Sequence, residues 1–302
     1  MKFSVIIPVY NRERLIEEAL DSVFAQTFDD FEVIVVDDGS TDRTAEVVRA
    51  YSGSVQLIHQ ENAGPGVARN TGIEAASGDY VAFLDSDDKW FPWTLSTYDT
   101  VIEQNDQPAL IGASMHRFRE EEELLKVENR PLVTDWYSDF LEGAGQGEYV
   151  STCAVAIRRS AVLNAGGLFS LNLNAEDHDL AFRLGTASGF VQVRAPTLVA
   201  VRRHNHQLTD QIRKTWRGLM HLLDREVHGE YPGGRERRWE RRYLLCQHTR
   251  SASLSLLREG HLAEAATLYR RTFGWQLRFL RVRYLAGFPG VALWTMLGPS
   301  AQ

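Results

Sequence analysis

Three aspartates in one short stretch are the residues of this chain best suited to chemistry. Tyr80–Leu84 is apolar enough to form a short buried strand, and three carboxylates follow it directly: Asp85, Asp87 and Asp88. Carboxylates two apart at a strand end can place oxygens on one side of a hard divalent cation, and a nucleotide diphosphate can supply further ligands. The alternative is an acidic turn between a strand and a helix, which is the commoner meaning of an isolated Asp-x-Asp.

Polar residues also follow two earlier apolar runs, each of which predicts a buried strand. Tyr10 and Asn11 come after Phe3–Val9, and an Asp37-Asp38 pair comes after Phe31–Val36. The carboxyl ends of parallel strands share one edge of a sheet, so we expect these clusters to converge with the three aspartates. Carboxylates gathered on one edge repel each other unless a cation or a donor-rich ligand offsets the repulsion.

Two of these positions have a functional and a structural interpretation. Asp38 can accept hydrogen bonds from a base or a ribose, although Ser40 or Asp42 capping a helix would make the aspartate pair an ordinary turn. Arg69 follows a glycine-rich loop, where a guanidinium and a helix N-terminus can face a phosphate or base. Taken alone, that loop is better explained as a helix start with a proline in its first turn.

The elements that must position these residues alternate between strand and helix periodicity. Apolar stripes predict a helix over residues 15–24, which Asn11 can cap, and further helices over 44–51 and 65–76. A third strand is predicted over Val55–His59. This alternation predicts an α/β fold of βαβ units on a mainly parallel central sheet.

The second half of the chain changes character near residue 205. Strands are predicted near residues 109–115 and 146–157, an apolar helix over Leu180–Ala187, and an extended segment over Phe190–Val201. Helical patterns then cover Ile212–His228, Arg238–Arg258 and Leu262–Phe273. We therefore expect an α/β domain over residues 1–205 and a helical region over 206–302.

Composition describes an ordinary globular protein whose charge is unevenly distributed. Of the 302 residues, 44% are hydrophobic and 24% charged, and the two cysteines have no metal-ligand spacing, which favours a reducing compartment. The first residues predict a strand rather than an export signal. The net charge is −7, yet residues from 201 onward hold 18 basic against 8 acidic side chains. No run reaches the roughly 20 apolar residues of a spanning helix.

Four stretches resemble, in order and spacing, the successive signatures of the family 2 glycosyltransferases, which have the GT-A fold. They are Val5-Ile-Ile-Pro-Val-Tyr-Asn11, Val36-Asp-Asp-Gly-Ser-Thr-Asp42, Asn62-x-Gly64-Pro-Gly66-x-Ala68-Arg-Asn70-x-Gly72 and Leu84-Asp-Ser-Asp-Asp88. Each is weak alone, but the four together are a strong signal. The resemblance covers roughly residues 3–205. It implies that residues 1–205 form the nucleotide-sugar-binding and catalytic domain, and that the helical region over 206–302 shapes the acceptor site or mediates association.

The resemblance implies a nucleotide-sugar donor, with UDP favoured, and a divalent metal, Mn²⁺ or Mg²⁺. The matching positions give a donor site made of Pro8 and Tyr10 along the nucleoside, Asp38 at the base, Arg69 beside it, and Asp85 and Asp88 toward the ribose, donor or metal. Asp87 matches the direct metal ligand, with Asp85 as its companion. His204 stands where some members of the family place an extra metal ligand, although a lone histidine is as often structural.

The pair Glu176-Asp177 resembles the acceptor-side motif of the family and supplies the catalytic residues. Asp177 is carried over as the general base, which removes the proton of an acceptor hydroxyl attacking the anomeric carbon from the face opposite the diphosphate. That geometry inverts the anomeric centre. The structural alternative is that Asp177 or Asp179 caps the helix beginning at Leu180.

Departures from the family narrow the expected activity. The Gln-x-x-Arg-Trp motif of processive synthases is missing, so we expect transfer of one sugar per encounter, to a glycan or lipid-linked acceptor in polysaccharide or cell-envelope biosynthesis. Two other classes stay open: a nucleotide-sugar-binding protein without catalysis, and a sugar nucleotidyltransferase of related fold. The second is weaker because Pro8-Val-Tyr-Asn11 stands where a glycine-rich loop with a basic residue is needed.

The basic C-terminal region has two interpretations. Five arginines fall within residues 235–242, and five more are interleaved with aromatic and leucine residues over 270–283. Such a segment can lie on an anionic membrane surface, which fits a cytoplasmic enzyme at the inner face of the cell membrane. The sequence favours the alternative, pairing with the acidic front or packing in a homodimer. No nucleic-acid-binding motif is found.

Overall fold

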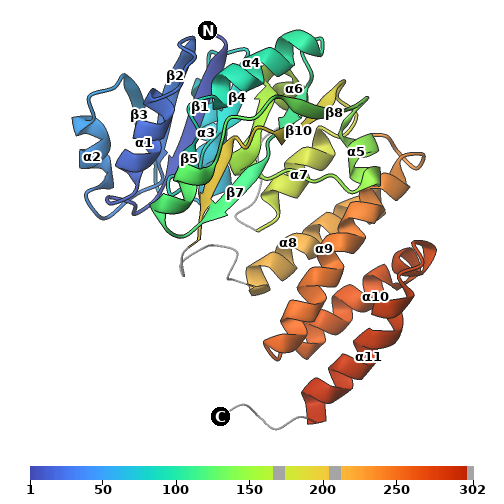
Figure 1. Ribbon diagram of the computed structural model, residues 1–302. Helices are drawn as coiled ribbons and strands as arrows, with labels where there is room; N and C mark the ends of the chain where they lie inside the picture. Colours follow the sequence, from blue (N-terminus) through green and yellow to red (C-terminus); the bar gives the residue numbers. More distant parts are fainter. Residues whose placement is uncertain (166–173, 204–211, 298–302) are drawn as a thin grey trace. The chain divides into compact units, whose positions relative to one another are not determined.

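The computed structural model describes residues 1–165, 174–203 and 212–297 (Figure 1). The chain forms two compact units. The first comprises residues 1–143, 149–172 and 176–205, and the second comprises 144–148, 173–175 and 206–302. The predicted catalytic role of residues 1–205 and the predicted role of residues 206–302 in acceptor shaping or association stay predictions.

A mixed sheet is the centre of the first unit. Within the described residues its strand order is β3-β2-β1-β4-β9-β6-β10-β8, and all but β9 and β8 run in the same direction. The α/β fold with a mainly parallel sheet is thus confirmed. The strands are β1 Phe3–Val9, β2 Phe31–Asp37, β3 Val55–His59, β4 Tyr80–Phe83, β6 Leu110–Gly112, β8 Val133–Tyr137, β9 Val155–Arg158 and β10 Phe190–Ala195.

Both faces of this sheet are covered, which explains why β1 is apolar at every position except Ser4. The odd-numbered residues of β1 pack with α1 (Ile16–Phe24) and α4 (Thr94–Gln104) in the main hydrophobic core. The opposite face meets α3 (Pro65–Ala75), where Gly72 lies against Ile6. The remaining helices of this unit are α2 (Thr44–Ala50), α5 (Phe140–Gln146), α6 (Arg159–Asn164) and α7 (Glu176–Arg183), with 3₁₀ turns at Glu121–Lys126 and Thr152–Ala154.

The contact between α3 and β1 gives a stability prediction for Gly72→Ala. A Cβ at this position would overlap Cγ2 of Ile6, whose side chain is fully buried. Overpacking of this kind costs about 1–3 kcal/mol of unfolding free energy, which denaturant titration would measure. Glu74→Ala, at an exposed position of the same helix, is the matched control and should change stability by less than about 0.5 kcal/mol. Equal stability of the two variants would show that α3 can shift away from the sheet.

A smaller sheet, β5-β11-β7, extends the first unit. It consists of Lys89–Trp90, Val199–Arg202 and Met115–Phe118, with β11 in the middle. Because β5 directly follows the three aspartates and pairs with β11, the end of β11 comes close to that cluster.

Three local predictions were wrong. The strand predicted over 146–157 is the end of α5, a 3₁₀ turn closed by the Ala154 amide on the Ser151 carbonyl, and only then β9. The helix predicted at Leu180 begins at Glu176, because acidic side chains in a first turn favour the positive end of a helix. Asn11 does not cap α1: its Oδ1 accepts from the Thr41 amide at 2.8 Å, and its φ is 50°.

The second unit contains four long helices, drawn orange to red in Figure 1: α8 (Ile212–His228), α9 (Arg238–Arg258), α10 (Leu262–Arg278) and α11 (Val282–Leu297). The patterns predicted α8 and α9 at these bounds, whereas α10 runs five residues further and α11 was not predicted. Glu226 of α8 is buried and joins α9 through Arg241 at 2.6 Å and Arg242 at 2.8 Å. Among the described residues, no helix is long and apolar enough to cross a bilayer.

Candidate donor and acceptor site

Arg69 is the centre of the candidate site. Its side chain is buried in α3 and spans two carboxylates: one terminal nitrogen donates to Asp85 Oδ1 at 2.7 Å, and the other to Glu176 Oε1 at 3.3 Å. Asp85 follows β4 and Glu176 begins α7, so residues 107 positions apart in sequence share one guanidinium. The predicted donor-side and acceptor-side motifs therefore lie together in the first unit.

Asp38 follows β2 and is bound by the glycine-rich segment that precedes α3. Its Oδ1 accepts from Gln60 Nε2 at 2.7 Å and from the Ala63 amide at 2.9 Å, and its Oδ2 accepts from the Gly64 amide at 2.8 Å. A carboxylate has about four acceptor positions, so these three bonds leave one for a ligand. Asp38 thus fixes the loop that leads to Arg69.

The residues around Asp38 divide into buried and exposed ones. Asp37 is fully buried, accepts from the Ser40 amide at 3.0 Å and contacts His59 Nδ1 at 2.9 Å. These contacts match the alternative given above, in which the aspartate stabilises a turn. Pro8 is buried in β1, paired with Val36 of β2. Tyr10 comes directly after β1 and is 44% exposed, so its ring is open to a ligand at this edge of the sheet.

Asp88 is the buried member of the aspartate cluster. Its Oδ1 accepts from the Arg202 amide at 2.9 Å, at the end of β11. Burial first, and then the negative charges of Asp85 and Asp87, raise the pKa of Asp88 to about 8. A carboxylate whose ionised form is opposed by two like charges is suited to a neighbouring cation, which would favour that form.

The donor atoms of this cluster fit a hard divalent cation. Ligand atoms of Asp85, Asp88 and Cys153 lie within 4.8 Å of one another. Burial, followed by the charges of Asp85 and Asp88, raises the pKa of the Cys153 thiol well above its usual value. Because a neutral thiol is a poor ligand for Mg²⁺ or Mn²⁺, the carboxylates are the fitting donors.

Asp87, predicted as the direct metal ligand, has a cationic neighbour. Arg12 Nε contacts its Oδ2 at 3.4 Å. The group of ligand atoms within 4.8 Å of one another includes Asp85 and Asp88 but not Asp87. His204, the predicted additional ligand, lies outside the described residues.

The predicted base lies in the first turn of α7. Asp177 Oδ1 accepts from the His178 amide at 2.8 Å and contacts His178 Nδ1 at 2.6 Å. Burial alone would lower the pKa of His178, but the charge of Asp177, the hydrogen bond to it, and Glu176 together raise it. Burial also raises the pKa of Glu176, with Arg69 opposing and Asp177 and Asp85 adding to the shift.

Several residues of this site were missed by sequence reasoning. Arg202 closes the cluster from β11: its Nε donates to the Asp87 carbonyl at 3.2 Å, and its guanidinium pairs with Glu18 at 2.6 Å and Glu121 at 2.9 Å. Lys89 pairs with the same two glutamates. Arg12 and His178 directly follow recognised motifs in sequence, and Arg202 lies two positions before His204, which is the signal that could have found them.

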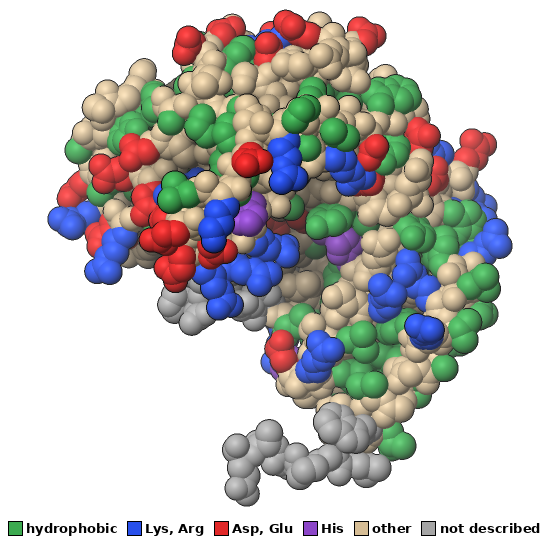
Figure 2. Space-filling model, in the orientation of Figure 1, with side chains coloured by type: hydrophobic (Ala, Val, Ile, Leu, Met, Phe, Trp, Pro, Cys, Tyr) green, Lys and Arg blue, Asp and Glu red, His purple; other side chains and the backbone are tan. Residues whose placement is uncertain are grey.

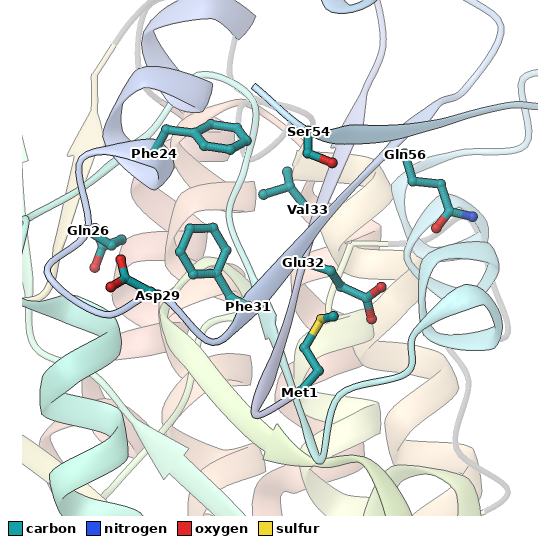
Figure 3. A pocket seen from close by; sticks show the side chains of 9 residues that line it. All are labelled: Met1, Phe24, Gln26, Asp29, Phe31, Glu32, Val33, Ser54 and Gln56. Carbon is teal, nitrogen blue, oxygen red and sulfur yellow. The ribbon is translucent and has the colours of Figure 1, made fainter. Parts of the chain in front are cut away.

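A surface cavity of about 530 Å³ lies apart from these carboxylates (Figure 3). Its walls come from the start of β2, the segment after α1 and the start of β3, and they include none of the predicted site residues. The lining residues are Met1, Phe24, Gln26, Asp29, Phe31, Glu32, Val33, Ser54 and Gln56. Asp37 and Asp38 lie at the opposite end of β2, so this cavity is not the site described above.

Comparison with known proteins decides the family. Residues 4–165, more than half of the chain, match the model of "Glycosyl transferase family 2". The chain belongs to glycosyl transferase family 2. This confirms the resemblance carried by the four motifs.

Relatives of this glycosyltransferase match it over part of their length. It is 44% identical over 108 residues to an uncharacterised glycosyltransferase, YibD, of Escherichia coli, and these cover 35% of the chain and 31% of YibD. It is 36% identical over 178 residues to an uncharacterised glycosyltransferase of Rickettsia bellii, covering 58% of the chain and 24% of the relative. The chain thus spans under a third of the length of these two proteins.

Solved structures share the fold of this glycosyltransferase at low identity. TarS 1–349 of S. aureus in complex with UDP-GlcNAc has a TM-score of 0.71 and 20% identity, covering 100% of this chain and 93% of TarS 1–349. The mannosyltransferase PcManGT of Pyrobaculum calidifontis, in complex with GDP-Man and Mn²⁺, has a TM-score of 0.57 and 19% identity, covering 98% and 87%. These matches establish the GT-A-like fold.

Proposed function

We propose that this protein transfers one sugar from a nucleotide-sugar donor to an acceptor hydroxyl, with inversion at the anomeric carbon and in the presence of a divalent metal. The observation that carries the proposal is Arg69, which holds the donor-side Asp85 and the acceptor-side Glu176 on one guanidinium. A site that joins the two motifs in this way can bring both substrates to one place, which is the main requirement of a two-substrate transfer.

The donor would bind along the edge where β1, β2 and β4 end. Tyr10 offers an exposed ring to the nucleoside, and Asp38 keeps an acceptor position for the base. UDP is the favoured nucleotide, supported by the complex of the structurally similar TarS with UDP-GlcNAc. Arg69, which pairs with Asp85, is proposed to act on the donor from beside the aspartate cluster.

Asp85, Asp87 and Asp88 would hold the metal, Mn²⁺ or Mg²⁺, with His204 as a further proposed ligand. A bound divalent cation neutralises the charge that develops on a leaving diphosphate. PcManGT, whose structure contains Mn²⁺ and GDP-Man, supports this proposal through its shared fold. The raised pKa of Asp88 is consistent with carboxylates arranged for a cation.

Asp177 is proposed as the general base. The acceptor oxygen forms its bond to the anomeric carbon as the bond from that carbon to the diphosphate oxygen breaks, and the hydroxyl proton passes to Asp177. The bonding electrons leave with the diphosphate. His178 orients the Asp177 carboxylate through the 2.6 Å contact, and Arg69 holds Glu176 beside it.

The proposed acceptor is a glycan or a lipid-linked glycan of polysaccharide or cell-envelope biosynthesis. Helices α8–α11 are proposed to shape the acceptor site or to mediate association, in the cytoplasm or at the inner face of the membrane. The family membership supports a glycan acceptor, and the basic composition of residues 201–302 supports an anionic partner.

Donor hydrolysis tests the proposal directly. We expect turnover of one member of a panel of UDP-, GDP- and dTDP-sugars, lost in EDTA and restored by Mn²⁺ or Mg²⁺, with release of the nucleotide diphosphate measured by chromatography. Hydrolysis undiminished by EDTA would remove the metal from the proposal. Donor binding without hydrolysis or transfer to any acceptor would instead support a nucleotide-sugar-binding protein.

A further inference from the structure

The last helix of the described chain is apolar around its whole circumference. Arg283 is the only charged residue of α11, and no charged residue follows it to the end of the sequence. A helix of this kind is normally buried, yet Val282, Val291 and Leu293 of α11 are 60%, 40% and 57% exposed. With 16 residues, it is about 24 Å long, which is shorter than the roughly 30 Å hydrocarbon core of a bilayer.

Helix α10 presents a second apolar stripe next to α11 in sequence. Phe273 and Leu277, four residues apart on α10, are 44% and 53% exposed, and Leu280, in the turn that follows the helix, is 78% exposed. The buried side of α10 contacts α9, where Gln276 donates to the Cys246 carbonyl at 2.9 Å. The side chains of Phe273 and Leu277 are exposed.

Arginines and aromatic rings are combined on the same part of the second unit. Arg242 lies over the Trp275 ring at 4.6 Å from its centroid, and Arg281 lies over Tyr243 at 5.1 Å. Trp239 has three guanidinium groups within 5.5 Å of its ring, those of Arg238, Arg242 and Arg278. Figure 2 shows hydrophobic and basic side chains intermingled over the C-terminal helices. Tryptophan and arginine are the residues that settle at the headgroup level of a membrane.

The charges on these two helices distinguish between two partners for this surface, a second copy of the chain and a lipid bilayer. Residues 262–297 hold five arginines and one acidic residue, Glu264, which pairs with Arg213 at 3.3 Å. Arg271 pairs with Asp224 at 2.7 Å, which leaves Arg270, Arg278, Arg281 and Arg283 as the other positive charges. A second copy meeting this surface by two-fold symmetry would place arginines against arginines, which is repulsive. A surface of anionic lipid phosphates offers the opposite charge and also an apolar layer beneath it.

We propose that the exposed surface of α10 and α11 binds peripherally to an anionic lipid bilayer. Phe273, Leu277 and Leu280, together with Val282, Val291 and Leu293, enter the boundary between headgroups and acyl chains. Arg278, Arg281 and Arg283 contact lipid phosphates. The proposal does not depend on the donor site, since it uses residues of the second unit alone. It gives the protein a fixed position at the surface where a lipid-linked acceptor would be presented.

Vesicle flotation of the full chain tests the proposal. We expect flotation with vesicles of phosphatidylcholine containing 30% phosphatidylglycerol at low salt, weaker flotation at 0.5 M NaCl, and little with pure phosphatidylcholine. No flotation with the anionic vesicles at low salt would overturn the proposal. The assay contains no nucleotide, so its failure is distinct from a failure of sugar transfer.

Two variants separate the apolar and the charged contributions. Leu277→Ser with Leu280→Ser should abolish flotation, and Arg278→Gln with Arg283→Gln should weaken binding to anionic vesicles about 25-fold, at roughly fivefold per arginine. Arg258→Gln, exposed at the end of α9, is the matched control and should float as the original chain does. Circular dichroism checks that each variant is folded. A dimer in sedimentation that the leucine variant dissociates, without flotation of the original chain, would assign the surface to a second copy instead.

Discussion

Asp177→Asn is expected to lower the rate of sugar transfer by about 10²–10⁴-fold, the contribution of a positioned general base. Asparagine keeps the shape of the side chain and can still accept from His178, but it cannot take a proton from the acceptor. Donor affinity should stay within about twofold, because the donor-side contacts of Arg69 and Asp38 are untouched. Steady-state transfer kinetics and calorimetric titration with the donor measure the two quantities.

The control for this variant is Asp106→Asn, which removes the same charge from an exposed turn. Its φ of 52° suits asparagine equally well, so both folding and transfer should be unchanged. Transfer by Asp177→Asn at the original rate would refute the base assignment. Loss of both donor binding and sugar transfer would show that Asp177 supports the structure of the site rather than the proton transfer.

Arg69→Met is expected to lower the free energy of unfolding by about 3 kcal/mol, because it leaves two carboxylates beside a missing cation. This value is the low end of the range for a broken buried pair, since the Asp85 side chain is 35% exposed and water screens part of the charge. Methionine fills most of the space, so a cavity contributes little. Denaturant titration followed by circular dichroism gives the change.

Arg69→Lys serves as the comparison for that prediction. Lysine keeps the positive charge but has a single ammonium, which cannot donate in two directions as the guanidinium does to Asp85 and Glu176. We expect intermediate stability and a donor affinity lower than that of the original chain. A midpoint for Arg69→Met equal to that of the original chain would mean that the two carboxylates are neutral or hydrated without Arg69.

Much of the first unit could be predicted from local patterns because its strands are buried on both faces. Phe3–Val9 is apolar at every position except Ser4, and all seven residues are buried in β1. Helices α8 and α9 were predicted at their observed bounds because 17 and 21 residues give several turns of periodicity. Long helices repeat their apolar pattern often enough to exclude a strand over the same residues.

Other elements could not be predicted because their patterns are short or their environment is unusual. The strand β9 has four residues, too few for a period to be distinguished from the adjoining 3₁₀ turn. The start of α7 was missed because its first turn is acidic rather than apolar, and the charge at a helix terminus leaves no hydrophobic stripe. Helix α11 has apolar residues on all sides, so it shows no amphipathic period.

In the candidate site too, some features could be predicted from the sequence and others could not. The convergence of the motifs after β2 and β4 was predictable, since the carboxyl ends of parallel strands share an edge. The partners within it were not: the Arg202 amide reaches Asp88 across 114 positions, and Arg69 reaches Glu176 across 107. Such contacts depend on how distant segments pack, which no local pattern contains.

The three hydrogen bonds to Asp38 have a consequence for the thermodynamics of donor binding. A glycine-rich loop without such an anchor would sample many conformations, and a ligand would have to restrict them at a cost in entropy. Here the chain meets that cost during folding, when the Gln60 side chain and the amides of Ala63 and Gly64 bind Asp38. At the proposed donor site, a nucleotide sugar would meet a loop already held by three hydrogen bonds, so less of its contact energy would be lost in ordering that loop.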